Sequence, residues 1–227
     1  MRLLLLPGMD GTGDLFRPLI EALSLPARVV SYPTDELAGY AELLELARSQ
    51  LTDEPTIVVG ESFSGPLAVR LGDDPRVVGV VLAASFASSP LRYGSRALGS
   101  VAPLLFRASP PRFLLRALLA GFNAPGTLID ALKATLRRLP SNVLAARLLD
   151  VLAVDVRQEL RASRTPLLVL VPTRDRLVHK GLSRELAALR PDARVLNFQA
   201  PHLLLQRAPA EAAAAIEEFA RELSLKT

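Results

Sequence analysis

Short apolar runs recur along the chain, and longer stretches with apolar residues at helical spacing separate them. The runs read as strands because they are brief, rich in Leu, Val and Ile, and bounded by Gly, Pro or Asp. They predict strands at residues 2–6, 27–31, 56–59, 77–84, 167–171 and 194–198. The stretches between them, such as 39–51, 182–189 and 210–223, have the apolar stripe of amphipathic helices. Regular alternation of strand and helix predicts an α/β fold, a doubly wound and mostly parallel sheet with helices on both faces.

Residues 86–164 interrupt this alternation. They carry prolines between helical patches, and no strand pattern appears among them. The segment therefore predicts an all-helical insertion that acts as a cap or lid above the sheet. We expect one domain overall, with residues 1–85 and 165–227 as its core and residues 86–164 as the cap.

The length and composition fit one α/β domain with an insertion and exclude some chemistry. The chain has 227 residues, half of them hydrophobic, and no cysteine. The absence of cysteine excludes disulfides, thiol catalysis and zinc–thiolate sites. The opening MRLLLLPG has too short an apolar run for a signal peptide, and no run approaches the length of a membrane span. From these features we predict a cytoplasmic location.

Charge is distributed unevenly along the chain. Residues 86–164 contain twelve basic and four acidic residues, a net charge of +8, whereas the whole chain has +4. A basic segment of this kind is typical of a surface for an anionic carrier or an anionic membrane, although solvated helix faces give the same pattern. We expect these charges to face outward, because an unpaired arginine is costly to bury. The segment lacks interleaved stacking aromatics, which argues against nucleic-acid binding.

The strand at 56–59 leads into Gly60-Glu61-Ser62-Phe63-Ser64-Gly65, and a helical apolar pattern follows. A strand, a tight turn of small residues and a helix form the context in which a serine becomes an exposed nucleophile. Ser62 is therefore the candidate nucleophile. The alternative is a Gly/Ser turn without chemistry, because so short a string also occurs by chance.

A serine nucleophile needs a histidine base and a carboxylate that orients the base. Of the two histidines, His202 follows the last predicted strand, and His179 lies before a helix. Asp175 follows the strand at 167–171. Because parallel strands place such residues at the carboxyl edge of the sheet, we predict His202 as the base and Asp175 as the acid. The rival carboxylates are Asp150 and Asp155.

The loop after the first strand, Pro7-Gly8-Met9-Asp10-Gly11-Thr12-Gly13, admits three interpretations. A phosphate-binding loop would end in Gly-Lys-Ser/Thr, but Asp14 follows Gly13. A calcium loop starting at Asp10 would need glycine where Leu15 stands. The third interpretation is an oxyanion loop, whose backbone N–H groups stabilise developing negative charge on a substrate.

The order Ser62, Asp175, His202, with the glycine-rich loop at 7–13 and the Ser62 turn, resembles the α/β-hydrolase superfamily over nearly the whole chain. Leu177-Val178 after Asp175 and Pro209 after His202 add to the resemblance, and Ser64 and Pro172 depart from it where glycine is common. The resemblance implies a serine hydrolase acting on a small-molecule carboxylic ester or thioester with an apolar acyl group.

The same resemblance implies an oxyanion hole made by the N–H groups of Met9 and Phe63, and neither a cofactor nor a metal. Two alternatives share the fold. One is an acyltransferase using the same three side chains. The other is a non-catalytic protein that binds hydrophobic ligands, since a fold alone does not determine function.

Overall fold

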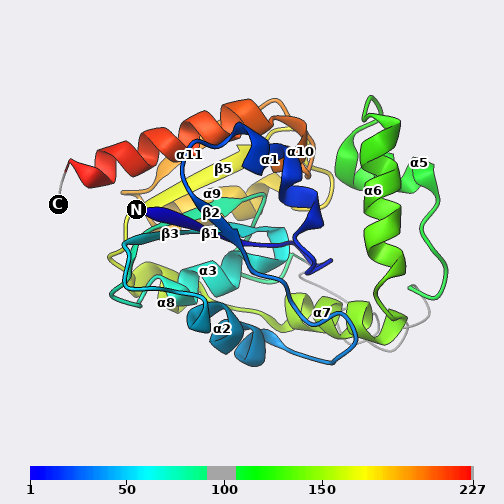
Figure 1. Ribbon diagram of the computed structural model, residues 1–227, viewed down its shortest axis with the longest axis horizontal. Coiled ribbons are helices and arrows are strands. Elements are labelled where there is room, and N and C mark those ends of the chain that lie inside the picture. Colours follow the sequence, from blue (N-terminus) through cyan, green and yellow to red (C-terminus); the bar gives the residue numbers. More distant parts are fainter. Residues whose placement is uncertain (91–105, 226–227) are drawn as a thin grey trace.

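The computed structural model describes residues 1–90 and 106–225. A parallel sheet with the order β2-β1-β3-β4-β5-β6 forms its centre (Figure 1). The strands are β1 (Arg2–Leu6), β2 (Ala27–Val29), β3 (Thr56–Glu61), β4 (Val77–Ala83), β5 (Leu167–Pro172) and β6 (Arg194–Phe198). Every pairing between them is parallel, which confirms the predicted fold class.

The central strands and the edge strand β6 differ in how deeply their residues are buried. Every residue of β3 and of β5 is buried, because helices cover both faces of the sheet. The register places Leu5 beside Val59 and Val59 beside Val81, so the apolar side chains stack across the sheet. In the edge strand β6, intermediate and exposed residues alternate. The polar positions of β6 therefore reflect its place at the rim.

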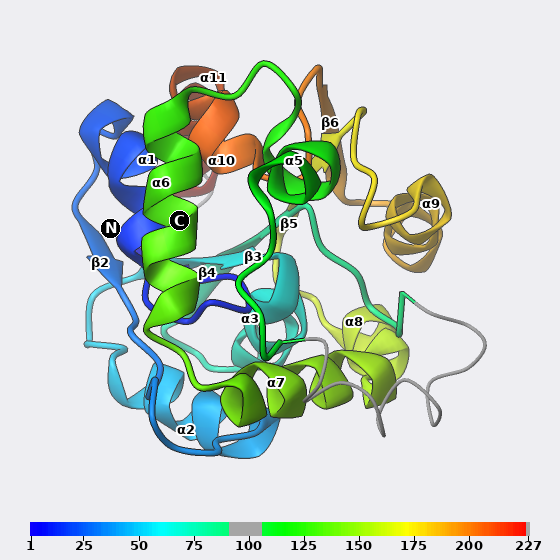
Figure 2. The same cartoon turned by 90° about the vertical axis from the view of Figure 1, so that its right-hand side faces the viewer.

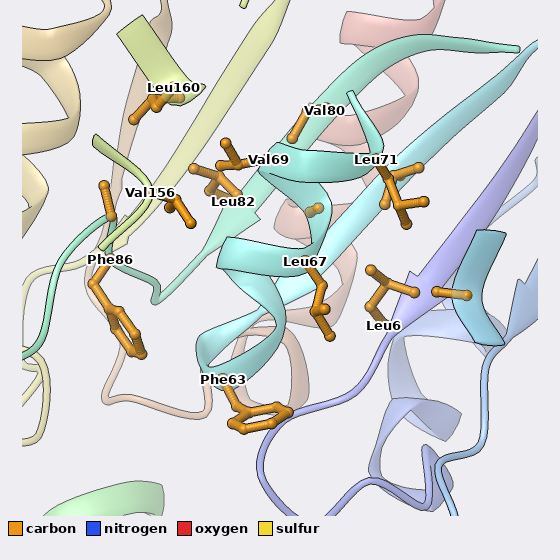
Figure 3. Packing of buried hydrophobic residues seen from close by; sticks show 14 of the residues in the cluster. Leu6, Phe63, Leu67, Val69, Leu71, Val80, Leu82, Phe86, Val156 and Leu160 are labelled. Carbon is orange, nitrogen blue, oxygen red and sulfur yellow. The ribbon is translucent and has the colours of Figure 1, made fainter. Parts of the chain in front are cut away.

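Helices cover the two faces with separate cores. On one face, α2 (Tyr40–Ser49), α3 (Gly65–Leu71), α8 (Arg157–Ala162) and α9 (Lys180–Leu189) contribute to a single apolar cluster. Figure 3 shows Leu67 of α3 near Leu6, with Val69, Leu82, Val156 and Leu160 to the side. On the other face lie α1 (Arg17–Ala22), α10 (Leu204–Arg207) and α11 (Pro209–Ser224). The sequence did not predict the short helix α10.

The described part of the segment 106–164 consists of helices and their connections, and Asp155 in one connection forms an isolated antiparallel bridge with Ser88. The helices are α5 (Arg112–Leu115), the π-helix η3 (Arg116–Ala120), α6 (Gly126–Arg137), α7 (Ser141–Ala153) and α8. Figures 1 and 2 show α5, α6 and α7 beyond the end of the sheet where the strands finish. Residues 91–105 of the predicted cap lie outside the described residues, and the division into core and cap stays a prediction. Leu160 of α8 belongs to the core beside α3, so the final part of 86–164 packs on the sheet.

No helix in the described part of the chain is long and apolar enough to cross a membrane.

Candidate active site

The turn after β3 holds Ser62 in an unusual backbone conformation. Ser62 has φ of 49°, in the left-handed region that costs a non-glycine residue roughly 1–3 kcal/mol. Strand and helix approach closely on either side of it. A Cβ added to Gly60 would lie 2.7 Å from the Ser64 carbonyl oxygen, and one added to Gly65 would lie 1.7 Å from Ser85 Oγ. The small residues around Ser62 are therefore required by packing.

His202 and Asp175 lie in line with Ser62. His202 Nε2 is 2.9 Å from Ser62 Oγ, and His202 Nδ1 is 2.8 Å from Asp175 Oδ2. Because a carboxylate only accepts hydrogen bonds, His202 Nδ1 is the donor to Asp175, and Nε2 is the ring nitrogen that faces the serine hydroxyl. The imidazole is 3% exposed, so the line is shielded from water except at Ser62, which is partly exposed.

Backbone groups hold the carboxylate in this orientation. Asp175 Oδ1 accepts hydrogen bonds from the N–H groups of Leu177, at 2.8 Å, and Val178, at 2.9 Å. These two bonds leave Oδ2 directed at the histidine. The dipeptide after Asp175, one basis of the family resemblance, thus has a local structural reason.

The rival residues lie in other environments. His179 is exposed, and its Nδ1 accepts a hydrogen bond from the Gly181 N–H at 3.0 Å, which caps α9. Asp155 is paired with Arg157, and a hydrogen bond from that guanidinium lowers the pKa of Asp155. Asp150 lies on α7, where burial raises the pKa of its carboxyl. The structure brings only Asp175, of the three candidate acids, to His202.

The loop after β1 runs beside the Ser62 turn. Within it, the Gly11 N–H donates to the Gly8 carbonyl at 3.0 Å, and the Tyr32 N–H donates to the Gly11 carbonyl at 2.7 Å. Asp10 is buried and accepts hydrogen bonds from the N–H and hydroxyl of Thr12. The Met9 N–H makes no hydrogen bond to the described part of the protein. It remains available to a ligand at the place where the sequence predicted an oxyanion donor.

The calcium interpretation of this loop finds no support. Asp10 is engaged with Thr12, and Asp14 forms an ion pair with Arg138. The two carboxylates therefore serve separate contacts. Among the described residues, no group of three or more His, Cys, Asp or Glu side chains is arranged to hold a metal ion.

Comparison with known proteins agrees with this architecture. The family model described as the alpha/beta hydrolase family matches residues 3–215. This chain belongs to the α/β hydrolase family. A search of curated protein sequences finds no match.

Solved structures similar to this α/β hydrolase include several esterases. A thermophilic esterase from Thermogutta terrifontis superposes with a TM-score of 0.80 at 19% identity, over 98% of this chain and 90% of that one. An esterase from Exiguobacterium antarcticum gives 0.80 at 14% identity, over 97% and 92%. The enol-lactonase from Burkholderia xenovorans LB400 gives 0.76 at 19% identity, over 98% and 90%. At these identities the similarity establishes the fold.

Ser64, which departs from the glycine common in the hydrolase turn, has a hydrogen-bonding role. Its buried hydroxyl contacts the Pro7 carbonyl oxygen, and it lies 2.7 Å from the hydroxyl of Tyr32. A carbonyl only accepts, so Ser64 donates to Pro7 and Tyr32 donates to Ser64. Burial raises the pKa of Tyr32, which keeps its phenol protonated as a donor. This chain of hydrogen bonds links the Ser62 turn to the loop that contains Met9.

Arg147 of α7 contradicts the expectation that the basic residues of 86–164 all face outward. Its side chain is 1% exposed. The guanidinium donates to the carbonyl oxygens of Met9 at 2.9 Å, Asp10 at 3.0 Å and Pro33 at 2.6 Å. Burial is tolerated because these carbonyls, together with the nearby charge of Asp10, compensate the cation. The sequence signal for this burial was the position of Arg147 among the apolar residues of α7.

Glu61, beside Ser62, is a buried carboxyl that the sequence analysis did not single out. Burial raises the pKa of Glu61 to about 7. Its Oε2 accepts a hydrogen bond from Gln206 Nε2 at 3.3 Å, and its Oε1 has no hydrogen-bond partner among the described residues. Asp10 and Glu61 both lie close to Gly8, since a Cβ added there would be 3.5 Å from Asp10 Oδ1 and 3.9 Å from Glu61 Oε2, and the charge of Asp10 also raises the pKa of Glu61. The residue that directly precedes Ser62 is therefore a buried carboxyl whose pKa is near neutral.

Proposed function

We propose that this α/β hydrolase cleaves carboxylic esters or thioesters through a covalent acyl-enzyme formed on Ser62. The observation that carries the proposal is the hydrogen-bonded line from Ser62 through His202 to Asp175. A hydroxyl becomes a useful nucleophile when a base lies within hydrogen-bond reach and a third group orients that base.

In the first half of the reaction, Ser62 Oγ attacks the substrate carbonyl carbon while His202 Nε2 accepts the hydroxyl proton. The carbonyl π electrons move onto oxygen to give a tetrahedral oxyanion. Collapse of this intermediate expels the alcohol or thiol, which takes the proton from His202. Asp175 keeps the imidazole in the required tautomer and stabilises the imidazolium that forms.

Two backbone N–H groups would stabilise the oxyanion. One belongs to Met9 in the loop after β1, and the other to Phe63 immediately after the nucleophile. Loss of one such donor typically costs about 10²–10³ in turnover. In the second half, water attacks the acyl-enzyme with His202 as base, which releases the acid and regenerates Ser62.

Apolar clusters beside the site support an apolar acyl group. Met9 packs against a cluster that contains Leu139, Val143 and Leu144 from the cap region. Leu203, next to His202, packs with Leu115 and other apolar residues of the cap region. Each methylene buried against such walls contributes about 0.8 kcal/mol. We therefore expect medium-chain acyl esters to be cleaved faster than acetyl esters.

The test combines a fluorophosphonate probe with a panel of esters and thioesters from short to medium chain length. The probe should label Ser62 and no other serine, and Ser62→Ala should abolish labelling and turnover. Labelling at Ser64 would contradict the assignment, and a folded protein without labelling would indicate the non-catalytic binding protein. An added alcohol acceptor separates the remaining alternative, because an acyltransferase would form new ester in place of free acid.

A further inference from the structure

An apolar surface lies on the outer side of the α5–η3 segment. Its members are large apolar side chains that are exposed to solvent, two of them phenylalanines at 68% (Phe113) and 65% (Phe122). We call this the α5 surface. Its apolar residues are Phe113 and Leu114 of α5, Leu118 of η3, Phe122 just after η3, and Leu177 of the loop after β5, whose neighbour Arg176 lies over the Phe122 ring. The sequence left open whether the apolar residues of the cap face the substrate or the outside. The structure exposes these five residues, while Leu115 of α5 and Ala120 of η3 are buried.

Positive charge surrounds the α5 surface. Residues 106–124 contain three arginines and no acidic residue. Arg112 is paired with Asp130, but Arg116 donates to the backbone carbonyls of Phe122 and Ala124 and keeps its charge uncompensated. Arg176 lies over the Phe122 ring, 5.3 Å from its centre. Among the described residues, neither Arg116 nor Arg176 has a carboxylate partner.

The α5 surface adjoins the candidate active site. Leu119 of η3 accepts a hydrogen bond from the Leu203 N–H at 3.0 Å, one residue from His202. On the other side, Arg176 follows Asp175 directly along the chain. Figures 1 and 2 show α5 at the end of the molecule farthest from the C-terminus.

We propose that the α5 surface binds anionic lipid bilayers. Aromatic and leucine side chains flanked by arginine are the composition of segments that lie in the bilayer interface. An acidic carrier protein bound through charge alone would satisfy the arginines and leave the two phenylalanines in water. A bilayer accommodates both, since apolar side chains enter its acyl region and arginines meet its phosphates. Each basic residue near such a surface contributes an attraction equivalent to about a fivefold change in binding.

Bound to a bilayer, this surface would deliver lipid-phase substrates to Ser62. That delivery rests on the proposed function, whereas vesicle binding does not. Binding is therefore measured on the Ser62→Ala protein. The chain contains no tryptophan. Phe113→Trp consequently introduces the only tryptophan, on the α5 surface, and Leu225→Trp introduces the only one at the opposite end, on a residue that is 88% exposed.

The vesicles are either phosphatidylcholine alone or an equal mixture with phosphatidylglycerol. We expect blue-shifted emission from Trp at position 113, and co-sedimentation, with the anionic vesicles only. The tryptophan at 225 should keep the emission of a water-exposed side chain. Changing Arg176 to Gln should weaken binding about fivefold, and salt near 1 M should weaken it further, because screening shortens to about 3 Å.

Three results would overturn the proposal: no partition into anionic vesicles, equal partition into neutral vesicles, or equal blue shifts at 113 and 225. Binding of a purified acidic acyl-carrier protein without vesicle binding would also overturn it. Far-UV circular dichroism checks that each variant is folded. Hydrolysis of a soluble ester by the unmutated protein is measured separately, so that loss of the surface and loss of the proposed function are distinguished.

Discussion

Replacing Ser64 by alanine removes one hydroxyl from the middle of a buried hydrogen-bond chain. In the structure Tyr32 donates to Ser64, and Ser64 donates to the Pro7 carbonyl. The substitution leaves both neighbours without a partner in a site that excludes water. An unsatisfied buried polar group costs about 1–3 kcal/mol, so the free energy of unfolding should fall by about 2–6 kcal/mol. Domains have only about 5–15 kcal/mol in total, so this loss would be large.

Tyr32→Phe provides the second side of a double-mutant cycle. It removes the donor to Ser64 but leaves Ser64 bonded to Pro7, so it should cost only about 1 kcal/mol. In the double variant the phenol hydroxyl is gone, and only the Pro7 carbonyl is stranded. The double variant should therefore lose about 2–4 kcal/mol less than the sum of the single variants.

Urea unfolding measures the three variants and the parent protein, with the slope against denaturant expected to stay constant. Ser49→Ala is the matched control, because Ser49 is on the surface of α2 and should change the stability by less than about 0.5 kcal/mol. Single-variant losses that add to within about 0.5 kcal/mol would refute the coupled chain. Turnover supplies a second test. Ser64→Ala should lower kcat at unchanged KM, because the hydrogen bonds from Tyr32 through Ser64 to Pro7 hold the Met9 loop against the Ser62 turn.

Three further predictions concern the site. Asp175→Asn should lower the turnover of a soluble ester by about 10⁴ with an unchanged melting temperature, and Asp150→Asn should not. The folded-state pKa of Glu61 lies above the ordinary 4.5, at about 7, so stability should fall by about 3 kcal/mol as pH rises through that window. Unfolding of Glu61→Gln should lack this fall. Arg147→Met should lower kcat more than it raises KM, because carbonyls of the Met9 loop lose their donor, and steady-state kinetics measures both.

The sequence was most informative where chemistry coincides with the end of a strand. Ser62 and Asp175 follow the buried strands β3 and β5, His202 follows the edge strand β6, and a parallel sheet brings the carboxyl ends of its strands to one edge. The strands themselves were predictable because the central ones are continuous apolar segments between turn residues. Their exact ends were less so: β3 extends to Glu61, two residues beyond the predicted end, because it still pairs with β4 there.

Contacts between distant segments could not be predicted from the same patterns. Periodicity shows that α5 has two faces, but only its packing against Leu203 decides that Phe113 is outside. Arg147 reads as an ordinary basic residue of a helix, because its partners lie more than 100 positions away in the sequence. The raised pKa of Glu61 likewise depends on burial and on the charge of Asp10, which lies 51 positions away in the sequence.

The region 86–164 consists of parts with different roles, although its composition suggests a single lid. If α7 moved away from the sheet, the carbonyls of Met9, Asp10 and Pro33 would lose their hydrogen bonds to the Arg147 guanidinium. Each buried group left without a partner costs about 1–3 kcal/mol. We therefore expect α7 to stay in place and to hold the Met9 loop in position through the hydrogen bonds of Arg147. By contrast, the apolar side chains of the α5 surface are exposed to solvent, so changing them should leave the Met9 loop in place. Variants at Arg147 should consequently alter turnover on soluble esters and leave vesicle binding intact, while variants at Phe113 should do the reverse. If both sets changed both properties together, the region would have to be treated as one cooperative unit.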